Sequence, residues 1–151
     1  MPEGAATPKP KAPEVVLAFD LGRRRIGVAC GDTVTLRASP LGALAAAGGA
    51  RWEAIGSLLS EWQPALLVVG LPYNADGSES AAAGQARDFA RELTRRYALP
   101  VELVDERYSS LEAGARLKGA RASGLRRRRV AKPDVDAAAA CVILERWLGH
   151  L

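Results

Sequence analysis

Histidine and cysteine are nearly absent from this sequence. Its only histidine is His150, next to the C-terminus, and its two cysteines, Cys30 and Cys141, both lie within apolar runs. Because zinc sites and histidine-based catalytic triads need such side chains in clusters, neither kind of site is expected. The cysteines are expected to be small core residues of a reduced, cytoplasmic protein.

Long hydrophobic runs are also missing. No apolar segment reaches the roughly 20 residues that a membrane-spanning helix needs. Residues 1–13 are rich in proline and alanine and lack the apolar core of a signal peptide. We therefore expect a disordered tail over 1–13, a single domain over 14–151, and a protein that is cytoplasmic and does not enter a membrane.

Lysine is scarce as well, although the chain is basic. Lysine and arginine together number 21 against 17 acidic residues, which gives a net charge of +4, and only four of the 21 are lysine. Arginine suits bidentate contacts with phosphate groups, and a basic domain suggests a polyanionic partner. From charge alone, a basic protein that binds no nucleic acid is about as well supported as one that does.

Apolar patterning predicts an α/β fold. A meander of three antiparallel strands is followed by helices that alternate with two further strands, which is typical of a mixed sheet covered by helices. The expected strands span 15–20, 26–31, 33–38, 65–70 and 100–104. The expected helices span 50–62, 79–98, 109–118 and 134–148.

Carboxylates stand where active sites commonly form. Asp20 ends the first strand, and Glu106 closely follows the strand over 100–104. Asp134 and Asp136 open the last helix. Because sites in open α/β sheets gather at strand ends, these acids could converge on one edge. Oxygen ligands without histidine favour Mg²⁺ or Mn²⁺ over zinc.

Each acid also has a structural interpretation. An unpaired carboxylate in an apolar strand is costly, so Asp20 could pair with an arginine of the following loop, residues 23–25. Glu106 could pair with Arg107 at the surface. Asp134 fits the cap of the last helix, and Asp136 falls in its first turn, where the helix dipole favours a negative charge. Patterning alone therefore leaves an acidic metal site and a set of structural carboxylates both open.

Four segments together resemble the YqgF family of RNase H-like nucleases. In chain order they are FDLGRRRIGVACGD, LLVVGLPYNADGSES, VELVDERYSS and KPDVDAAAACVILERWL, and the resemblance covers about residues 15–149. Members of this family are also described as Holliday-junction resolvases and pre-16S rRNA nucleases. The resemblance implies an RNase H-like fold: a five-stranded mixed sheet, made of an antiparallel meander plus parallel strands, with helices on both faces.

The resemblance also implies which carboxylates are catalytic. Asp20, Glu106 and Asp136 would form the catalytic and metal-binding set, in a site for two Mg²⁺ or Mn²⁺ ions. Asp134 would then be the helix cap.

Basic and amide side chains near these acids are the expected nucleic-acid contacts. The segment over 119–132 is rich in arginine and leads into the last helix, so we expect it to bind the phosphate backbone. The alternative is a solvated loop without a ligand. Asn74 could bind a phosphate or be a turn residue. The full set comprises Arg23, Arg24, Arg25, Asn74, Arg107, Arg121, Arg126, Arg127, Arg128, Arg129 and Lys132.

We therefore expect a hydrolase, a metal-dependent endonuclease that acts on structured nucleic acid. Its role would be 5′-end processing of pre-16S rRNA in ribosome biogenesis or resolution of Holliday junctions, and only junction cleavage would require a homodimer. A non-catalytic nucleic-acid-binding module is the main alternative. A nucleotide-binding domain is a third, disfavoured because the chain is too short for two lobes and lacks the motif GxxxxGK(S/T).

Overall fold

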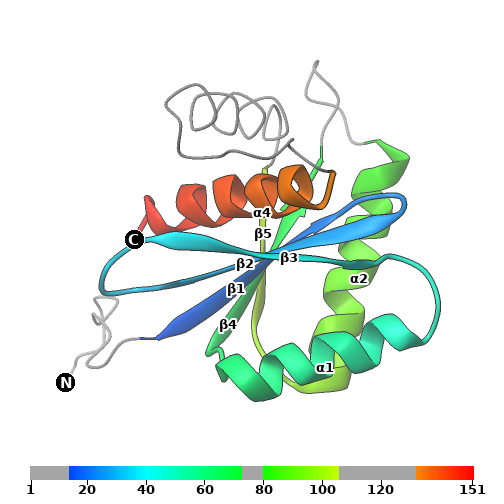
Figure 1. Ribbon diagram of the computed structural model, residues 1–151, viewed down its shortest axis with the longest axis horizontal. Coiled ribbons are helices and arrows are strands. Elements are labelled where there is room, and N and C mark those ends of the chain that lie inside the picture. Colours follow the sequence, from blue (N-terminus) through cyan, green and yellow to red (C-terminus); the bar gives the residue numbers. More distant parts are fainter. Residues whose placement is uncertain (1–13, 73–79, 106–131) are drawn as a thin grey trace.

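The computed structural model describes residues 14–72, 80–105 and 132–151, with side chains from residue 135 onward in the last range (Figure 1). These residues form one five-stranded sheet, with the strands in the order β3-β2-β1-β4-β5. The strands are β1 (Val15–Leu21), β2 (Arg25–Asp32), β3 (Ala38–Ala45), β4 (Leu66–Leu71) and β5 (Val101–Asp105). The helices of these ranges are α1 (Ala50–Trp62), α2 (Ala81–Tyr97) and α4 (Lys132–Leu148).

The sheet is mixed, as the sequence predicts. β1 pairs antiparallel with β2, and β2 pairs antiparallel with β3, so the first three strands form the expected meander. β1 pairs parallel with β4, and β4 pairs parallel with β5. Because β1, β4 and β5 run in the same direction, their carboxyl ends lie along one edge of the sheet, where sites form in open α/β folds.

Helices cover both faces of the sheet (Figure 1). α1 and α2 lie on one face, where Leu17 and Phe19 of β1 are buried in the larger apolar cluster. α4 lies on the other face, where Val16 and Ala18 are buried with residues of α4. Because side chains alternate between the faces of a strand, Asp20 follows Val16 and Ala18 on the α4 side. The pattern of β1 therefore directs this carboxylate toward α4.

One predicted strand is wrong. The sequence predicts a strand over 33–38, but β3 begins only at Ala38. The preceding residues form a turn held by Asp32, whose carboxylate accepts hydrogen bonds from the backbone N–H of Val34 (2.9 Å) and of Thr35 (2.7 Å). Such a turn overrides the strand propensity of β-branched residues.

The last helix begins earlier than predicted. α4 starts at Lys132, so Asp134 lies inside the helix and its predicted role as the helix cap is wrong. Pro133 is compatible with the first turn because the N–H that proline lacks has no partner within a helix there. Cys141, which the sequence predicts to be a core residue, is buried on this helix, as is Ala137 one turn before it.

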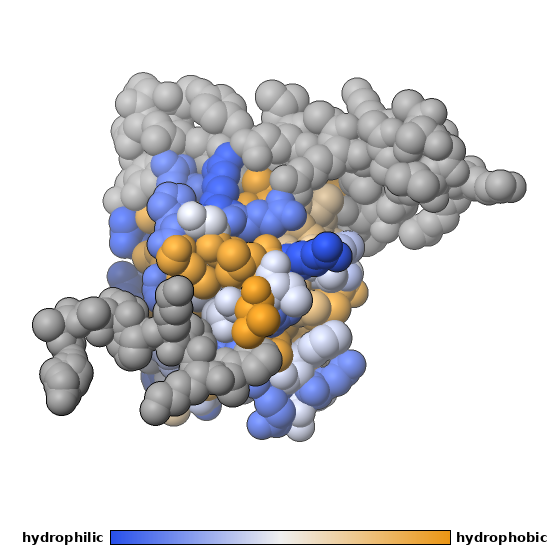
Figure 2. Space-filling model, turned by 90° about the vertical axis from the view of Figure 1, so that its left-hand side faces the viewer, coloured by the Kyte–Doolittle hydropathy of each residue, from blue (hydrophilic) through white to orange (hydrophobic). Residues whose placement is uncertain are grey.

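Two predicted segments, the tail over 1–13 and the helix over 109–118, lie outside the described residues. Of the two cysteines, Cys30 is partly buried and Cys141 is buried. In the three described ranges, no helix is long and apolar enough to cross a membrane. Apolar surface shows between polar side chains at the end of the molecule that carries the C-terminus (Figure 2). The exposed large apolar side chains of the described residues are Val34, Leu36, Leu103 and Leu151.

Gly27 of β2 lets α4 lie directly on the sheet. A Cβ atom at this position would be 2.0 Å from the carbonyl oxygen of Asp136, far inside van der Waals contact. Gly27 is also the residue that pairs with Asp20 across the β1–β2 ladder. The missing side chain therefore brings the backbone of α4 at Asp136 next to the position of Asp20.

Gly27→Ala should destabilise the protein, because the new methyl group forces α4 away from β2. We expect the free energy of unfolding to fall by about 1–3 kcal/mol or more, as for other overpacked sites. Urea denaturation measures this change.

Gly84→Ala is the matched control. A Cβ at Gly84, in α2, would meet nothing within 4 Å, so alanine should stabilise the helix by about 0.5–1 kcal/mol. If alanine were tolerated equally well at both positions, the close contact at Gly27 would be refuted.

Candidate active site

Asp20 and Asp136 lie on two sides of one glycine. Asp20, near the end of β1, pairs with Gly27 across the β1–β2 ladder. The carbonyl of Asp136 packs on Gly27 from the α4 face, which is also the face that strand alternation gives to Asp20. The structure thus brings two of the three predicted catalytic residues to one edge of the sheet, and both are partly exposed there.

The third predicted catalytic residue, Glu106, lies outside the described residues. It directly follows Asp105, the last residue of β5, whose carbonyl accepts a 2.9 Å hydrogen bond from Nη1 of Arg146. Nε1 of Trp147 donates to Glu102 of the same strand at 3.0 Å. α4 therefore anchors the strand that leads to Glu106. Because these hydrogen bonds join residues distant in sequence, the sequence pattern could not have identified Arg146 as a residue that positions β5.

Arg25, the first residue of β2, forms an ion pair with Asp136. Its Nε donates to Oδ2 of Asp136 at 2.7 Å, and the two side chains are 32% and 29% exposed. The Nη groups of Arg25 form no hydrogen bond to any of the described residues, so these donors remain available to a ligand. From the sequence, Arg25 is expected to pair with Asp20 or to bind phosphate. In the structure it forms an ion pair with Asp136 instead, another of the predicted catalytic acids.

The loop between β1 and β2 forms a cavity with Asp136. Gly22 closes the loop by donating its N–H to the carbonyl of Arg25 at 2.9 Å. The cavity has a volume of about 530 Å³ and is lined by Gly22, Arg23, Arg24, Arg25 and Asp136. Three guanidinium groups against one carboxylate make its walls net positive, which suits a phosphate backbone.

The two described carboxylates are suitable but incomplete metal ligands. Asp20 and Asp136 offer hard oxygen donors of the kind that Mg²⁺ and Mn²⁺ prefer. Across the described ranges, no group of three acidic, histidine or cysteine side chains is arranged to hold a metal ion. The predicted third ligand, Glu106, lies outside these ranges. The donor set therefore fits a divalent cation together with a further ligand.

The predicted nucleic-acid contacts are only partly described. The exposed side chains of Arg23 and Arg24 line the cavity beside Asp136. Lys132 begins α4, although its side chain is not among those described. The remaining residues lie outside the described part of the chain and stay predictions: Asn74, Arg107, Arg121, Arg126, Arg127, Arg128 and Arg129.

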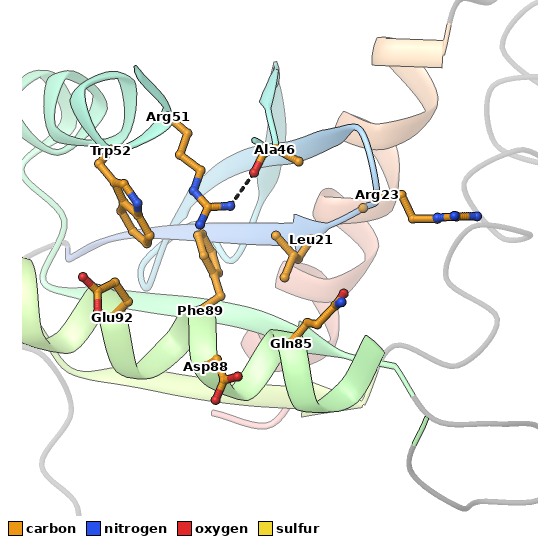
Figure 3. Close-up of a pocket in the computed structure, with 10 residues that line it drawn as sticks. Leu21, Arg23, Ala46, Arg51, Trp52, Gln85, Asp88, Phe89 and Glu92 are labelled. Atoms are coloured by element: carbon orange, nitrogen blue, oxygen red, sulfur yellow. Dashed lines mark hydrogen bonds between the residues drawn. The ribbon is translucent and has the colours of Figure 1, made fainter. Parts of the chain in front are cut away.

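A second open cavity, of about 630 Å³, lies on the other side of the β1–β2 loop (Figure 3). The end of β1, the first turn of α1 and one face of α2 line it. The sequence predicts the helix over 50–62 but does not single out its residue Arg51. Three polar residues of α2 that share one face, Gln85, Asp88 and Glu92, are the signal that could have identified this wall.

Comparison with protein families matches nearly the whole chain. The profile of RuvX, described as Holliday junction resolvase, matches residues 14–150. A protein of Xanthomonas campestris pv. campestris (strain 8004), named "Putative pre-16S rRNA nuclease", is 48% identical over 149 residues, which are 98% of this chain and 94% of that protein. A protein of Legionella pneumophila (strain Paris) with the same name is 46% identical over 135 residues, 89% of this chain and 94% of that protein.

Solved structures of RuvC share the fold. T. thermophilus RuvC in complex with a Holliday junction substrate matches with a TM-score of 0.59 and 17% identity, over 91% of this chain and 94% of that chain. A second structure of Thermus thermophilus RuvC matches with a TM-score of 0.56, over 90% of this chain and 95% of that chain. These likenesses confirm the predicted RNase H-like fold.

Arg25→Met and Asp136→Asn should be thermodynamically coupled. Because the ion pair is largely shielded but not buried, we expect a coupling free energy of about 1 kcal/mol, the upper end for surface pairs. It is the non-additive part of the unfolding free energies of the two single variants and the double variant.

The matched control is the pair of Arg91 and Asp88. Their side chains are 72% and 74% exposed, so Arg91→Met and Asp88→Asn should show a coupling nearer to zero. Strict additivity at Arg25 and Asp136 would contradict the contact between them.

Proposed function

The chain belongs to the Holliday junction resolvase family RuvX, and we propose that it cleaves phosphodiester bonds at the sheet edge where Asp20 and Asp136 flank Gly27. Membership of this family confirms the resemblance carried by the four sequence segments. The observation that carries the proposal is that Asp136 lines a cavity with three arginines, while its backbone packs on Gly27, the ladder partner of Asp20. Phosphodiester hydrolysis uses both, since carboxylates hold the cation and arginines hold the phosphate.

Asp20, Glu106 and Asp136 are proposed as the catalytic set that holds Mg²⁺ or Mn²⁺. When bound, two such ions activate water for in-line attack on phosphorus and stabilise the oxygen that leaves. Asp20 comes from β1 and Asp136 from α4, and the contact at Gly27 keeps these elements together. Glu106 is assigned from the sequence, as the acid that directly follows β5.

Arg25 is proposed to bind the carboxylate of Asp136 and the phosphate of the substrate at the same time. Its Nε holds Oδ2 of Asp136, which leaves its Nη groups to donate to a phosphate oxygen. Arg23 and Arg24 add positive charge along the same cavity. The three guanidinium groups offset the repulsion between the carboxylates and attract the negatively charged strand. On sequence alone, Asn74, Arg107, Arg121, Arg126, Arg127, Arg128, Arg129 and Lys132 are proposed to extend this surface.

Precursor 16S rRNA is the substrate that we propose. Relatives at 46–48% identity that cover nearly the whole chain carry the name of a pre-16S rRNA nuclease. Holliday junction resolution is the second candidate, favoured by the description of the family. Junction cleavage requires two sites related by a dyad, and hence a homodimer. Processing of one end of an RNA places no such demand on the protein.

Asp20→Asn should abolish cleavage while binding survives. The substitution keeps the size of the side chain but removes a charged ligand, so we expect the rate to fall by more than about 100-fold, beyond the loss caused by outer-shell partners of a metal. Cleavage is measured on a pre-16S rRNA leader and on a four-way DNA junction, each with Mg²⁺ or Mn²⁺. Binding of the same substrates is measured by fluorescence anisotropy. The substrate that is cut decides between the two candidate reactions.

Asp32→Asn is the matched control for this experiment. Asp32 lies at the far end of the β1–β2 ladder, opposite Val15, and an asparagine oxygen can still accept the turn hydrogen bonds from Val34 and Thr35. Its cleavage rate should equal that of the wild type. If Asp20→Asn cleaved as fast as the wild type, the carboxylates would be structural and the chain would be a nucleic-acid-binding module without turnover.

A further inference from the structure

The end of β3 holds the backbone of the β1–β2 loop. The β2–β3 ladder runs to the pair of Arg25 with Ala45. One residue beyond it, the N–H of Ala46 donates to the carbonyl of Arg24 at 2.9 Å, and Ala46 is only 6% exposed. The backbone is thus fixed at the arginine whose exposed side chain lines the cavity beside Asp136.

Ala46 begins a segment that has few side-chain contacts of its own. Residues 46–49 have the sequence Ala-Ala-Gly-Gly and connect β3 with α1. Gly48 has a φ of +92°, and a Cβ atom at Gly48 or Gly49 would meet nothing within 4 Å. Because glycine leaves the backbone conformationally free, a contact from another residue adds directly to the order of Ala46.

Arg51 supplies such a contact from the first turn of α1. Its Nη1 donates to the carbonyl of Ala46, which Figure 3 shows as a dashed line. Ala46 therefore accepts from Arg51 with its C=O and donates to Arg24 with its N–H. Two hydrogen bonds in series connect α1 with the arginine loop.

Aromatic packing holds the side chain of Arg51 in this orientation. Its guanidinium carbon lies 4.9 Å from the centroid of the Trp52 ring. That ring stacks on Phe89 of α2, and the carbonyl of Trp52 accepts a 2.6 Å hydrogen bond from the hydroxyl of Tyr97. Nε of Arg51 is buried and makes no hydrogen bond within the described part of the chain, although such a donor is costly. The packing therefore favours the contact of Nη1 with Ala46 over an acceptor for Nε.

We propose that Arg51 is a positioning residue for the phosphate-binding loop. Arg51 does not line the cavity of Asp136. It acts through Ala46 on the backbone of Arg24, and a guanidinium on a fixed backbone loses less conformational freedom when it binds a phosphate. This inference rests on the proposed nuclease function, because the contact of Arg24 with the phosphate is part of that proposal.

A double-mutant cycle of Arg51→Met and Arg24→Met tests the inference. Fluorescence anisotropy measures binding of the pre-16S rRNA leader and the four-way DNA junction, and every full-length protein in the cycle carries Asp20→Asn so that cleavage does not interfere. Arg24→Met should weaken binding by about 10-fold, as for one hydrogen bond to a charged group. Arg51→Met should weaken it by about 3- to 10-fold, because a displaced loop loses part or all of that contact.

The double variant distinguishes positioning from a direct contact. If Arg51 acts through Arg24, Arg51→Met should cause no further loss once Arg24 has been replaced. If Arg51 instead attracted the nucleic acid by its own charge, the two losses would multiply. A role in stability alone would lower the free energy of unfolding without changing the Kd of the folded protein.

Arg96→Met is the matched control for charge and stacking. The guanidinium carbon of Arg96 lies 4.5 Å from the centroid of the same Trp52 ring, but Arg96 takes no part in the two hydrogen bonds that lead to the loop. Its replacement should change the Kd for nucleic acid by less than about 2-fold. Arg51→Lys keeps the charge and an N–H donor for Ala46, so it should restore most of the affinity that Arg51→Met loses.

Gly22→Ala reaches the same loop from its other end, so the test remains decisive if Arg51→Met does not fold. A Cβ atom at Gly22 would lie 2.7 Å from the carbonyl oxygen of Arg25, which displaces the loop without altering Arg51. It should weaken binding and, like Arg51→Met, add little to the loss in Arg24→Met. Unchanged binding in Gly22→Ala would show that the position of the loop does not matter and would overturn the inference.

The outcomes separate this inference from the proposed function. Multiplying losses in the cycle, or an equal loss in Arg96→Met, would overturn the positioning role of Arg51. Such a result would leave the nuclease standing if Asp20→Asn still abolished cleavage. Wild-type affinity in Arg24→Met would overturn the inference together with the proposed phosphate contact of the loop. Non-additive losses together with wild-type affinity in Arg96→Met support the inference.

Discussion

The contact between α4 and β2 at Gly27 is the constraint on which the proposed active site depends. Any larger residue would place a Cβ atom 2.0 Å from the carbonyl oxygen of Asp136, so glycine alone allows the helix to lie on the strand at this point. The same glycine is the ladder partner of Asp20. A single missing side chain therefore lets the backbone at Asp136, near the end of the chain, lie on the strand next to Asp20, near its start, in a fold that solved RuvC structures share.

The loop after β1 determines what this edge of the sheet can bind. Its three arginines line the cavity beside Asp136, and Arg25 neutralises part of the charge of that residue. On the far side of the loop, Arg51 faces a wall of α2 that bears carboxylates. The side that Asp136 shares with the three arginines therefore suits a phosphate.

Local patterning predicts most of the fold because apolar periodicity reports burial directly, as in β1 and α4. It is wrong at β3, where the side chain of Asp32 binds the backbone of the following turn, an interaction that strand propensity does not include. The roles of Asp20, Glu106 and Asp136 follow from a family resemblance and not from periodicity. The ion pair of Arg25 with Asp136 joins residues 111 positions apart, so only the folded chain reveals it. The cavity at Arg51 was missed for the same reason, since three separate elements form it.

Binding of Mn²⁺ tests the central claim most directly, because it reports on the carboxylates without requiring a substrate. Calorimetric titration of the wild type should show binding, and Asp20→Asn and Asp136→Asn should each raise the Kd by more than about 10-fold, as expected when a direct ligand is removed. Asp32→Asn, whose carboxylate holds a turn at the other end of β2, should bind like the wild type. Equal affinity in all four proteins would contradict the joint metal site of Asp20 and Asp136.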